Sequence, residues 1–220
     1  MPVRQGQKMA TLDLHEQEQV EAFKAWWKDN GKWLLLVLVL VLGGFAATRG
    51  WHAYKNKQAG DAATLFAELN NQVASNDPKR INDAAAAVMD KYGSSAYAPR
   101  AALLAAQVNI HAKDVAQAKT QLQWVIDHAG EATLKDVARL NLASLLLDEK
   151  NYAGALALLG ASHPDSFNGL YADLKGDVLN AQGKAEEARA AYQQAFTMTD
   201  AKSPYRNLIQ MKLDALGGAK

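Results

Sequence analysis

The sequence contains no cysteine, so neither a disulfide scaffold nor a thiolate metal site can form. It also lacks a glycine-rich phosphate loop. Ser162, His163 and Asp165 supply the letters of a catalytic triad, but neighbours in sequence beside a proline favour a turn. None of the five histidines pairs with another at metal-ligand spacing on a helix face: His15, His52, His111, His128 and His163. These absences predict a protein that is not an enzyme and that needs no cofactor or metal.

An excess of charge of one sign is lacking as well. The 220-residue chain carries 24 Lys and Arg against 23 Asp and Glu. Residues 58–220 hold 16 basic and 18 acidic side chains of mixed order. Nucleic-acid-binding domains concentrate positive charge on one face, so this class of function is excluded.

A long hydrophobic run lies near the N-terminus. Residues 33–48 read WLLLVLVLVLGGFAAT, without a charge, between Lys32 and Arg49. Nine consecutive Leu and Val residues leave no polar face for water, which argues against a buried core helix. The run spans about 24 Å as a helix, and Trp and Lys flanks extend it towards the roughly 30 Å hydrocarbon core of a bilayer. We therefore predict a transmembrane helix over residues 33–51.

A cleavable signal peptide is the alternative interpretation of this run, because Gly44 and Ala46 are small enough for cleavage after Ala46. The preceding 32 residues, with five acids and a tryptophan pair, favour an uncleaved anchor instead. Charge does not orient the anchor, because three basic residues lie near each end: Lys24, Lys28 and Lys32 before it, and Arg49, Lys55 and Lys57 after it.

The segment before the anchor has a helical pattern. Asp13 and Glu16 match a capping box that would open a helix. Val20, Phe23 and Trp27 then share one face. Two interpretations are open: a short helix that contacts the membrane surface or a partner, or an N-terminal extension of the anchor helix.

The rest of the chain repeats a helix-turn-helix pattern. Four stretches align on a small residue: RINDAAAAV (80–88), DVAQAKTQL (114–122), NYAGALALL (151–159) and KAEEARAAY (184–192). Their equivalent residues are separated by 34, 37 and 33 positions: Ala84, Ala118, Ala155 and Ala188. A period near 34 is typical of tetratricopeptide repeats. No alternating strand pattern accompanies it.

The last copy fits this pattern best, with Gly176 before Ala188, and Tyr192 and Ala195 after it. Small residues let paired helices approach closely, and the aromatic ring fills the space between pairs. Upstream copies place Ala143, Ala106 and Gln72 at the Gly176 position, so the first copy is degenerate. Gly93, Gly160 and Gly183 are expected to end helices in the left-handed conformation. The predicted fold is all-α: one transmembrane helix, then a tetratricopeptide-like helical-repeat solenoid closed by a capping helix over residues 204–216.

Stacked helix pairs form a concave face that binds polypeptides, and the first helix of each pair lines it. The outward positions mix apolar and hydrogen-bonding groups, which suits an extended polypeptide of low specificity. These candidate groove residues are Arg100, Leu103, Gln107, His111, Val137, Asn141, Ser144, Asp148, Asp173, Asp177 and Asn180.

The chain resembles the ancillary SecYEG translocon subunit family, of the YfgM type. Three stretches in order carry the resemblance: QVEAFKAWWKDNGKWL (19–34), LKGDVLNAQGKAEEARAAY (174–192) and IQMKLDAL (209–216). The N-terminal MPVRQGQKMATLDL departs most from the family. The resemblance implies a bacterial inner-membrane protein, with residues 1–32 in the cytoplasm and a tetratricopeptide-like domain, residues 52–220, in the periplasm.

Two functions are expected from this resemblance. The first is a periplasmic chaperone or scaffold that associates with the SecYEG translocon, with a PpiD-like membrane-anchored chaperone and with exported client polypeptides. The second is a signalling adaptor whose cytoplasmic segment acts on an envelope-stress response regulator. The two differ in which part of the chain is active.

Overall fold

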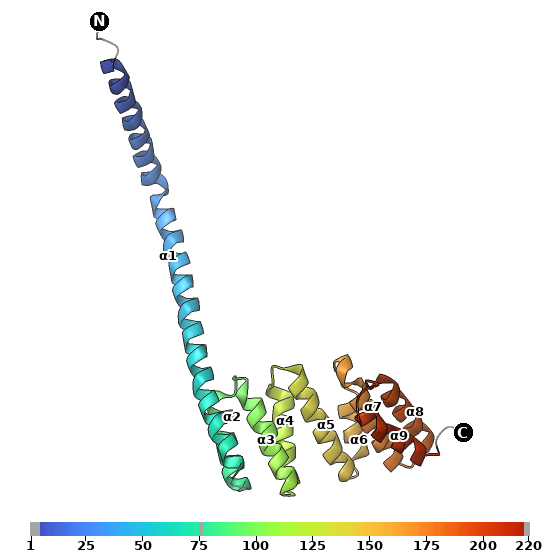
Figure 1. Ribbon diagram of the computed structural model, residues 1–220. Helices are drawn as coiled ribbons and strands as arrows, with labels where there is room; N and C mark the ends of the chain where they lie inside the picture. The colour runs from blue at the N-terminus through green and yellow to red at the C-terminus, as the bar shows by residue number, and fades with distance from the viewer. Residues whose placement is uncertain (1–4, 75–76, 218–220) are drawn as a thin grey trace. The chain divides into compact units, whose positions relative to one another are not determined.

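The computed structural model describes residues 5–74 and 77–217, with side chains from Gln17 onward (Figure 1). Within these ranges the chain is helical and has no strand. The elements are α1 (Gln5–Val73), α2 (Pro78–Tyr92), α3 (Tyr97–His111), α4 (Val115–His128), α5 (Ala132–Asp148), α6 (Tyr152–Leu159), a 3-10 turn η1 (Asp165–Phe167), α7 (Asn168–Ala181), α8 (Ala185–Met198) and α9 (Tyr205–Ala215). The predicted all-α class is confirmed.

The chain divides into two compact units, 1–56 and 57–220, and the boundary falls inside α1. In the first unit every large side chain of the apolar run, Leu34 to Leu42 and Phe45, is exposed. Among the described residues, α1 is the one helix long and apolar enough to cross a membrane. An exposed apolar surface of this length is unstable in water. Both the composition of the run and the exposure of its side chains therefore agree with a membrane anchor.

The segment before the apolar run belongs to the same helix. Since α1 begins at Gln5, the predicted capping box at Asp13 is wrong: no helix starts there. Phe23 lies 6.2 Å from Trp26 and 6.1 Å from Trp27 between ring centroids. A Cβ at Gly31 would lie 3.1 Å from the Trp27 ring, so the indole covers this glycine. Of the two interpretations of the segment, the helical extension is the one observed.

The second unit is a row of antiparallel helix pairs. Helices α3 and α4, α5 and α6, and α7 and α8 form three pairs, and each pair packs on the next. The C-terminal part of α1 joins α2 and α3 through Leu69, which is fully buried with Ile81, Ala85 and Val88. Helix α9 packs on α8 and ends the row. This arrangement is the predicted helical repeat with its capping helix.

The turns inside the three pairs have the same backbone geometry. Lys113 (φ 63°), Lys150 (φ 62°) and Gly183 (φ 77°) take the left-handed conformation 37 and 33 residues apart, which is the spacing of the repeat. Each turn closes with a bond from the next residue's N–H to a carbonyl five residues back. The expectation of a left-handed glycine is confirmed at Gly183 and wrong at Gly93 and Gly160, whose φ values are −54° and −80°.

Small residues occupy the centres of the pairs. Ala118, Ala155 and Ala188 are fully buried at the aligned position. In the first copy Ala85 is fully buried, whereas its neighbour Ala84 lies at the edge of the same cluster. Ala106 and Ala143 are fully buried too, in the first helices of their pairs. Alanine at these crossings lets the helix axes approach closely, which explains why the repeat is visible as a pattern of small residues.

Helix α6 is only eight residues long, and a polar cluster joins its neighbours instead. Asp136 of α5 is 1% exposed and accepts hydrogen bonds from Arg139 (2.7 Å) and from the Tyr171 hydroxyl of α7 (2.9 Å). The His163 ring stacks on Tyr171 at 3.8 Å between centroids. Burial, followed by the hydrogen bond to Asp136, raises the pKa of Tyr171 to about 12. The cluster thus connects the second helix pair to the third at the place where α6 is too short to do so.

An amide network connects the first pairs. Asn109 of α3, 1% exposed, exchanges two hydrogen bonds with Asn82 of α2 at 2.8 and 2.9 Å. It also donates to Gln121 of α4 at 2.8 Å, and Gln121 donates to Asn82 at 2.9 Å. The three amides therefore satisfy one another, and their fixed geometry aligns three helices.

Candidate binding groove

A groove of about 560 Å³ lies in the second unit between three successive first helices. Its lining residues come from the C-terminal part of α1, from along α3 and from the middle of α5. Figure 1 labels these three helices. The residues that line the groove are Phe66, Asn70, Arg100, Leu103, Leu104, Gln107, Ile110, Val137 and Asn141. The groove is thus on the face that stacked helix pairs generally present to ligands.

The lining combines apolar side chains with carboxamides. Phe66, Leu103, Leu104, Ile110 and Val137 are half-buried. All of them except Val137 also pack against the hydrophobic core between the helices. Between them stand the exposed amides of Asn70, Gln107 and Asn141. Phe66 is further fixed against Tyr97, 5.5 Å between ring centroids. Such a surface offers apolar contact and hydrogen bonding side by side.

The charge in the groove is neutralised. Arg100 donates two hydrogen bonds of 2.9 Å to the two carboxylate oxygens of Glu131, the residue that directly precedes α5. This forked pairing uses the planar geometry of the guanidinium and occupies both of its outer nitrogens. Among the described residues of the lining, no side chain other than Arg100 is ionisable.

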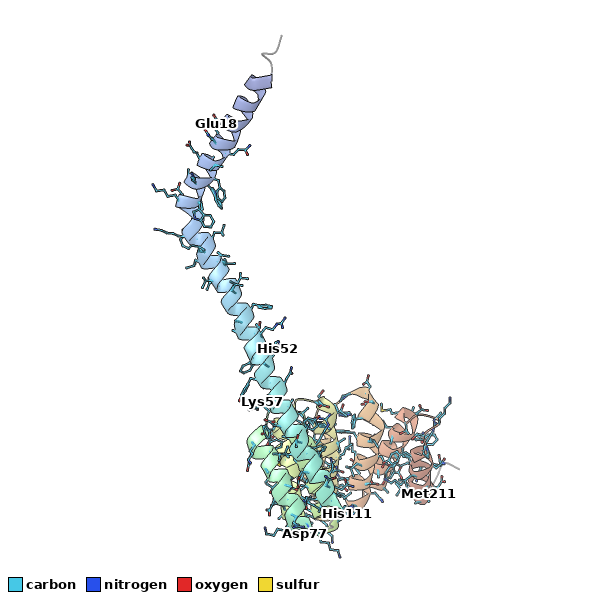
Figure 2. All side chains as sticks on the ribbon, turned by 60° about the vertical axis from the view of Figure 1, so that its left-hand side comes forward. Glu18, His52, Lys57, Asp77, His111 and Met211 are labelled. Carbon is cyan, nitrogen blue, oxygen red and sulfur yellow. The ribbon has the colours of Figure 1, made fainter. Side chains whose placement is uncertain are left out.

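A second hollow of about 460 Å³ continues the groove towards the last residue of α1, Val73, and the first residue of α2, Pro78. It shares Leu104 and Gln107 with the first. His111, at the end of α3 and labelled in Figure 2, lines this hollow together with Val73 and Pro78. The complete lining of the second hollow is Val73, Pro78, Leu104, Gln107, Val108, His111 and Ala112.

The structure brings part of the predicted groove set together. Five of the predicted residues line the first hollow: Arg100, Leu103, Gln107, Val137 and Asn141. A sixth, His111, lines only the second hollow, which Gln107 also lines. Ser144 and Asp148 follow on α5 and Asn180 lies on α7, outside the lining of both hollows. The groove is therefore concentrated in the first half of the repeat row.

Two predicted groove residues have another role, and their placement as open groove positions is wrong. Asp173 is 2% exposed and accepts bonds from the Tyr205 hydroxyl (2.5 Å) and from Lys212 Nζ (2.7 Å). Asp177 accepts from Lys212 Nζ and from the Tyr192 hydroxyl at 2.8 Å each. Helix α9 carries Tyr205 and Lys212, so it covers the face of α7 that the repeat pattern would leave open.

The tyrosines of this cluster titrate unusually. Burial, followed by the hydrogen bond to Asp177, raises the pKa of Tyr192 well above its ordinary value. Burial and the hydrogen bond to Asp173 raise the pKa of Tyr205 in the same direction. Both hydroxyls therefore remain donors at any physiological pH, and the attachment of α9 stays complete.

Sequence reasoning missed the contribution of α1 to the groove. Phe66 and Asn70 lie in the first copy, which was judged degenerate because Gln72 stands at its small position. The apolar spacing of Leu65, Phe66, Leu69 and Val73 was the available signal, since it marks one face of a helix.

Comparison with known proteins agrees with this architecture. The family model described as "Tetratricopeptide repeat-like domain" matches residues 24–218. No solved structure matches the chain.

Several curated proteins named "Ancillary SecYEG translocon subunit" are similar over almost their whole length. The relative from Neisseria gonorrhoeae is 33% identical, covering 92% of this chain and 98% of its own. Those from Escherichia coli and Haemophilus influenzae are 27% and 25% identical, covering 92% of this chain and 97% and 98% of their own. The apolar run, the repeat row and the final helix all lie within residues 24–218, which the family model matches. With a relative 33% identical over 92% of its length, the chain belongs to the family of ancillary SecYEG translocon subunits.

Proposed function

We propose that this chain is a single-pass inner-membrane protein that assists the SecYEG translocon by holding polypeptides. In this proposal residues 1–32 are cytoplasmic, residues 33–51 span the membrane, and residues 52–220 form a periplasmic binding domain. The groove takes up segments of exported chains, and a PpiD-like membrane-anchored chaperone is a neighbouring partner. The role is one of binding, without a chemical reaction.

The observation that carries this proposal is the groove on α1, α3 and α5, in a chain whose apolar run is long enough for an anchor. An anchored groove keeps its binding site within reach of one membrane complex, which raises the effective concentration of the two partners. The printed names of the relatives identify SecYEG as that complex for those proteins.

The orientation of the anchor rests on family likeness, because the basic residues are balanced across the run. Protease treatment of spheroplasts that express the full chain tests it. The proposal expects protease added outside the spheroplasts to digest residues 58–220. It also expects the mass of the mature chain to show that the chain begins at Met1 or Pro2 and is not cleaved before residue 33. Protection of residues 58–220 from the protease would show the opposite topology. A mass that corresponds to a chain cleaved after Ala46 would show that the apolar run is a signal peptide and not an anchor.

Site-specific photo-crosslinking tests the groove. A photoreactive amino acid at Leu103 or Asn141 is expected to capture nascent exported chains stalled in the translocon. Gln193 and Thr197, exposed on α8 away from the groove, are matched control positions. Capture that is absent at both groove positions, or equal at the control positions, contradicts the proposed binding role.

A further inference from the structure

We infer that the groove selects extended, uncharged stretches of polypeptide and reads their backbone through Asn70, Gln107 and Asn141. This inference deepens the proposed function and rests on it. It names the chemistry of the bound segment: alternating apolar side chains, free peptide groups and no carboxylate.

The three amides are available for a ligand. Asn70, Gln107 and Asn141 are all exposed, and their side chains make no hydrogen bond with any described residue. The buried amides Asn109 and Gln121 and the half-buried Asn82 of the same unit, by contrast, are all bonded to one another. A carboxamide offers both a donor and an acceptor, and it therefore matches the N–H and C=O of one peptide unit.

The placement of the amides suits an extended chain. They come from three successive first helices, α1, α3 and α5. An extended ligand leaves the N–H and C=O of its peptide units unpaired, so successive units can bond to the amides of successive helices. A helical ligand would keep its peptide groups bonded within itself and leave the amides unused.

The apolar side chains supply the remaining contact. Leu103 and Val137 are half-buried between the amides, as are Phe66, Leu104 and Ile110. In an extended ligand every second side chain faces the groove. Apolar residues at these positions remove more of this surface from water, so an alternating sequence is the favoured occupant.

The electrostatics of the groove disfavour acidic ligands. Recognition of a carboxylate needs a free Arg or Lys, and the guanidinium of Arg100 is already held by both oxygens of Glu131. A carboxylate placed in this lining would lose water without gaining a cation. The groove thus differs in kind from a site for acidic peptide tails.

Peptide titrations of the full-length protein in detergent micelles test the inference. A fluorescent nine-residue peptide that alternates Val or Leu with Ser or Asn is the reference ligand. Three changed versions keep its length: Glu at three polar positions, N-methylation of three backbone amides, and a stapled helix. Each change is expected to weaken binding about 10-fold or more, and added salt should change the reference affinity by less than about 2-fold.

Variants of the protein assign the effect to the amides. Asn141→Leu is close in size and lies on the surface, so the fold should tolerate it. It is expected to weaken the reference peptide by about 3- to 10-fold, as for the loss of one hydrogen bond, and to leave the N-methylated peptide unaffected. Gln193→Leu on α8 is the matched control and should bind the reference peptide as the wild type does.

The outcomes separate the inference from the proposed function. Equal or tighter binding of the acidic, N-methylated or stapled peptide overturns the inference, while peptide binding as such is retained. Binding of none of the peptides, together with no photo-crosslinking from Leu103, overturns both. Weakened binding by all three changed peptides and by Asn141→Leu supports the inference.

Discussion

The ring of Tyr192 occupies the space that a side chain at position 176 would need. A Cβ built on Gly176 would lie 2.5 Å from both Cδ1 and Cε1 of this ring. The ring is also held at its far end, because the Tyr192 hydroxyl donates to Asp177 at 2.8 Å. The position of the Tyr192 ring in the last helix pair therefore requires glycine at position 176.

Gly176→Ala should destabilise the repeat domain. The added methyl group forces the Tyr192 ring or the α7 backbone to move, and overpacking of this kind costs about 1–3 kcal/mol. For a chain of this size the midpoint of thermal unfolding should fall by about 3 to 10 °C. Circular dichroism of the full-length protein in detergent measures it.

Gly60→Ala is the control for this substitution. Gly60 is also inside a helix, but nothing lies within 4 Å of a Cβ built there. Alanine should therefore raise helix stability by about 0.5–1 kcal/mol. Equal destabilisation by both variants would show that the tyrosine contact is not the cause.

Lys150→Gly should stabilise the domain. Lys150 has φ 62°, a conformation that costs a residue with a Cβ about 1 kcal/mol and that glycine takes freely. Part of this gain is offset by the greater freedom of glycine in the unfolded chain, so an increase of about 0.5 kcal/mol is expected. Urea unfolding curves measure the change. Lys175→Gly, in the middle of α7, should instead destabilise by about 1 kcal/mol.

The turn at Lys150 also illustrates what the sequence could and could not predict. Helix pairs were predictable because small residues recur at fixed spacing, and the last three copies bury them fully at the aligned position: Ala118, Ala155 and Ala188. The left-handed turns were placed correctly only where a glycine occurs, at Gly183. Lysine carries no signal for this conformation, and the two copies with Lys113 and Lys150 adopt it because the surrounding helices impose it.

Contacts between distant residues account for most of the remaining differences. Asp173 was expected in an open groove, but Lys212 lies 39 residues away in sequence and 2.7 Å away in space. No local pattern encodes such a pairing. The groove was half predicted for a related reason: repeat positions identified Leu103 and Asn141, whereas Phe66 and Asn70 lie in a copy that lacks the repeat's small residue.

Lys212→Met should loosen α9. Lys212 Nζ lies 2.7 Å from Asp173 and 2.7 Å from Asp177, and the substitution leaves both carboxylates without a cation. Since Lys212 is partly exposed, a loss of about 2 kcal/mol is expected rather than the larger cost of a fully buried pair. Hydrogen exchange should show the amides of α9 opening before those of α7 and α8.

A second substitution separates charge from packing at α9. Asp173→Asn in the Lys212→Met background removes one of the unpaired charges and should restore part of the lost stability. Lys175→Met, an exposed lysine on α7, should change stability by less than about 0.5 kcal/mol. Failure of the second substitution to rescue would attribute the effect to lost packing of the lysine stem.

Stability should fall steeply in alkali because of the buried tyrosines. The pKa of Tyr171 is raised to about 12 in the folded chain, above the ordinary value of about 10. As the pH rises, the folded chain therefore keeps the proton of Tyr171 longer than the unfolded chain does. The contribution of this difference to the free energy of unfolding is complete below a pH of about 10 and is lost as the pH rises towards 12. Each such proton adds about 1.4 kcal/mol per pH unit to the slope of the free energy of unfolding against pH, and burial raises the pKa of Tyr192 and Tyr205 in the same direction.

Urea unfolding at several pH values above 10 measures this slope, and Tyr171→Phe should make it shallower by the equivalent of one proton. The hydrogen bond from Tyr171 to Asp136, buried between α5 and α7, is the reason to expect this change. An unchanged slope in that variant would mean that Tyr171 ionises as freely in the folded chain as in the unfolded one, and it would contradict the prediction.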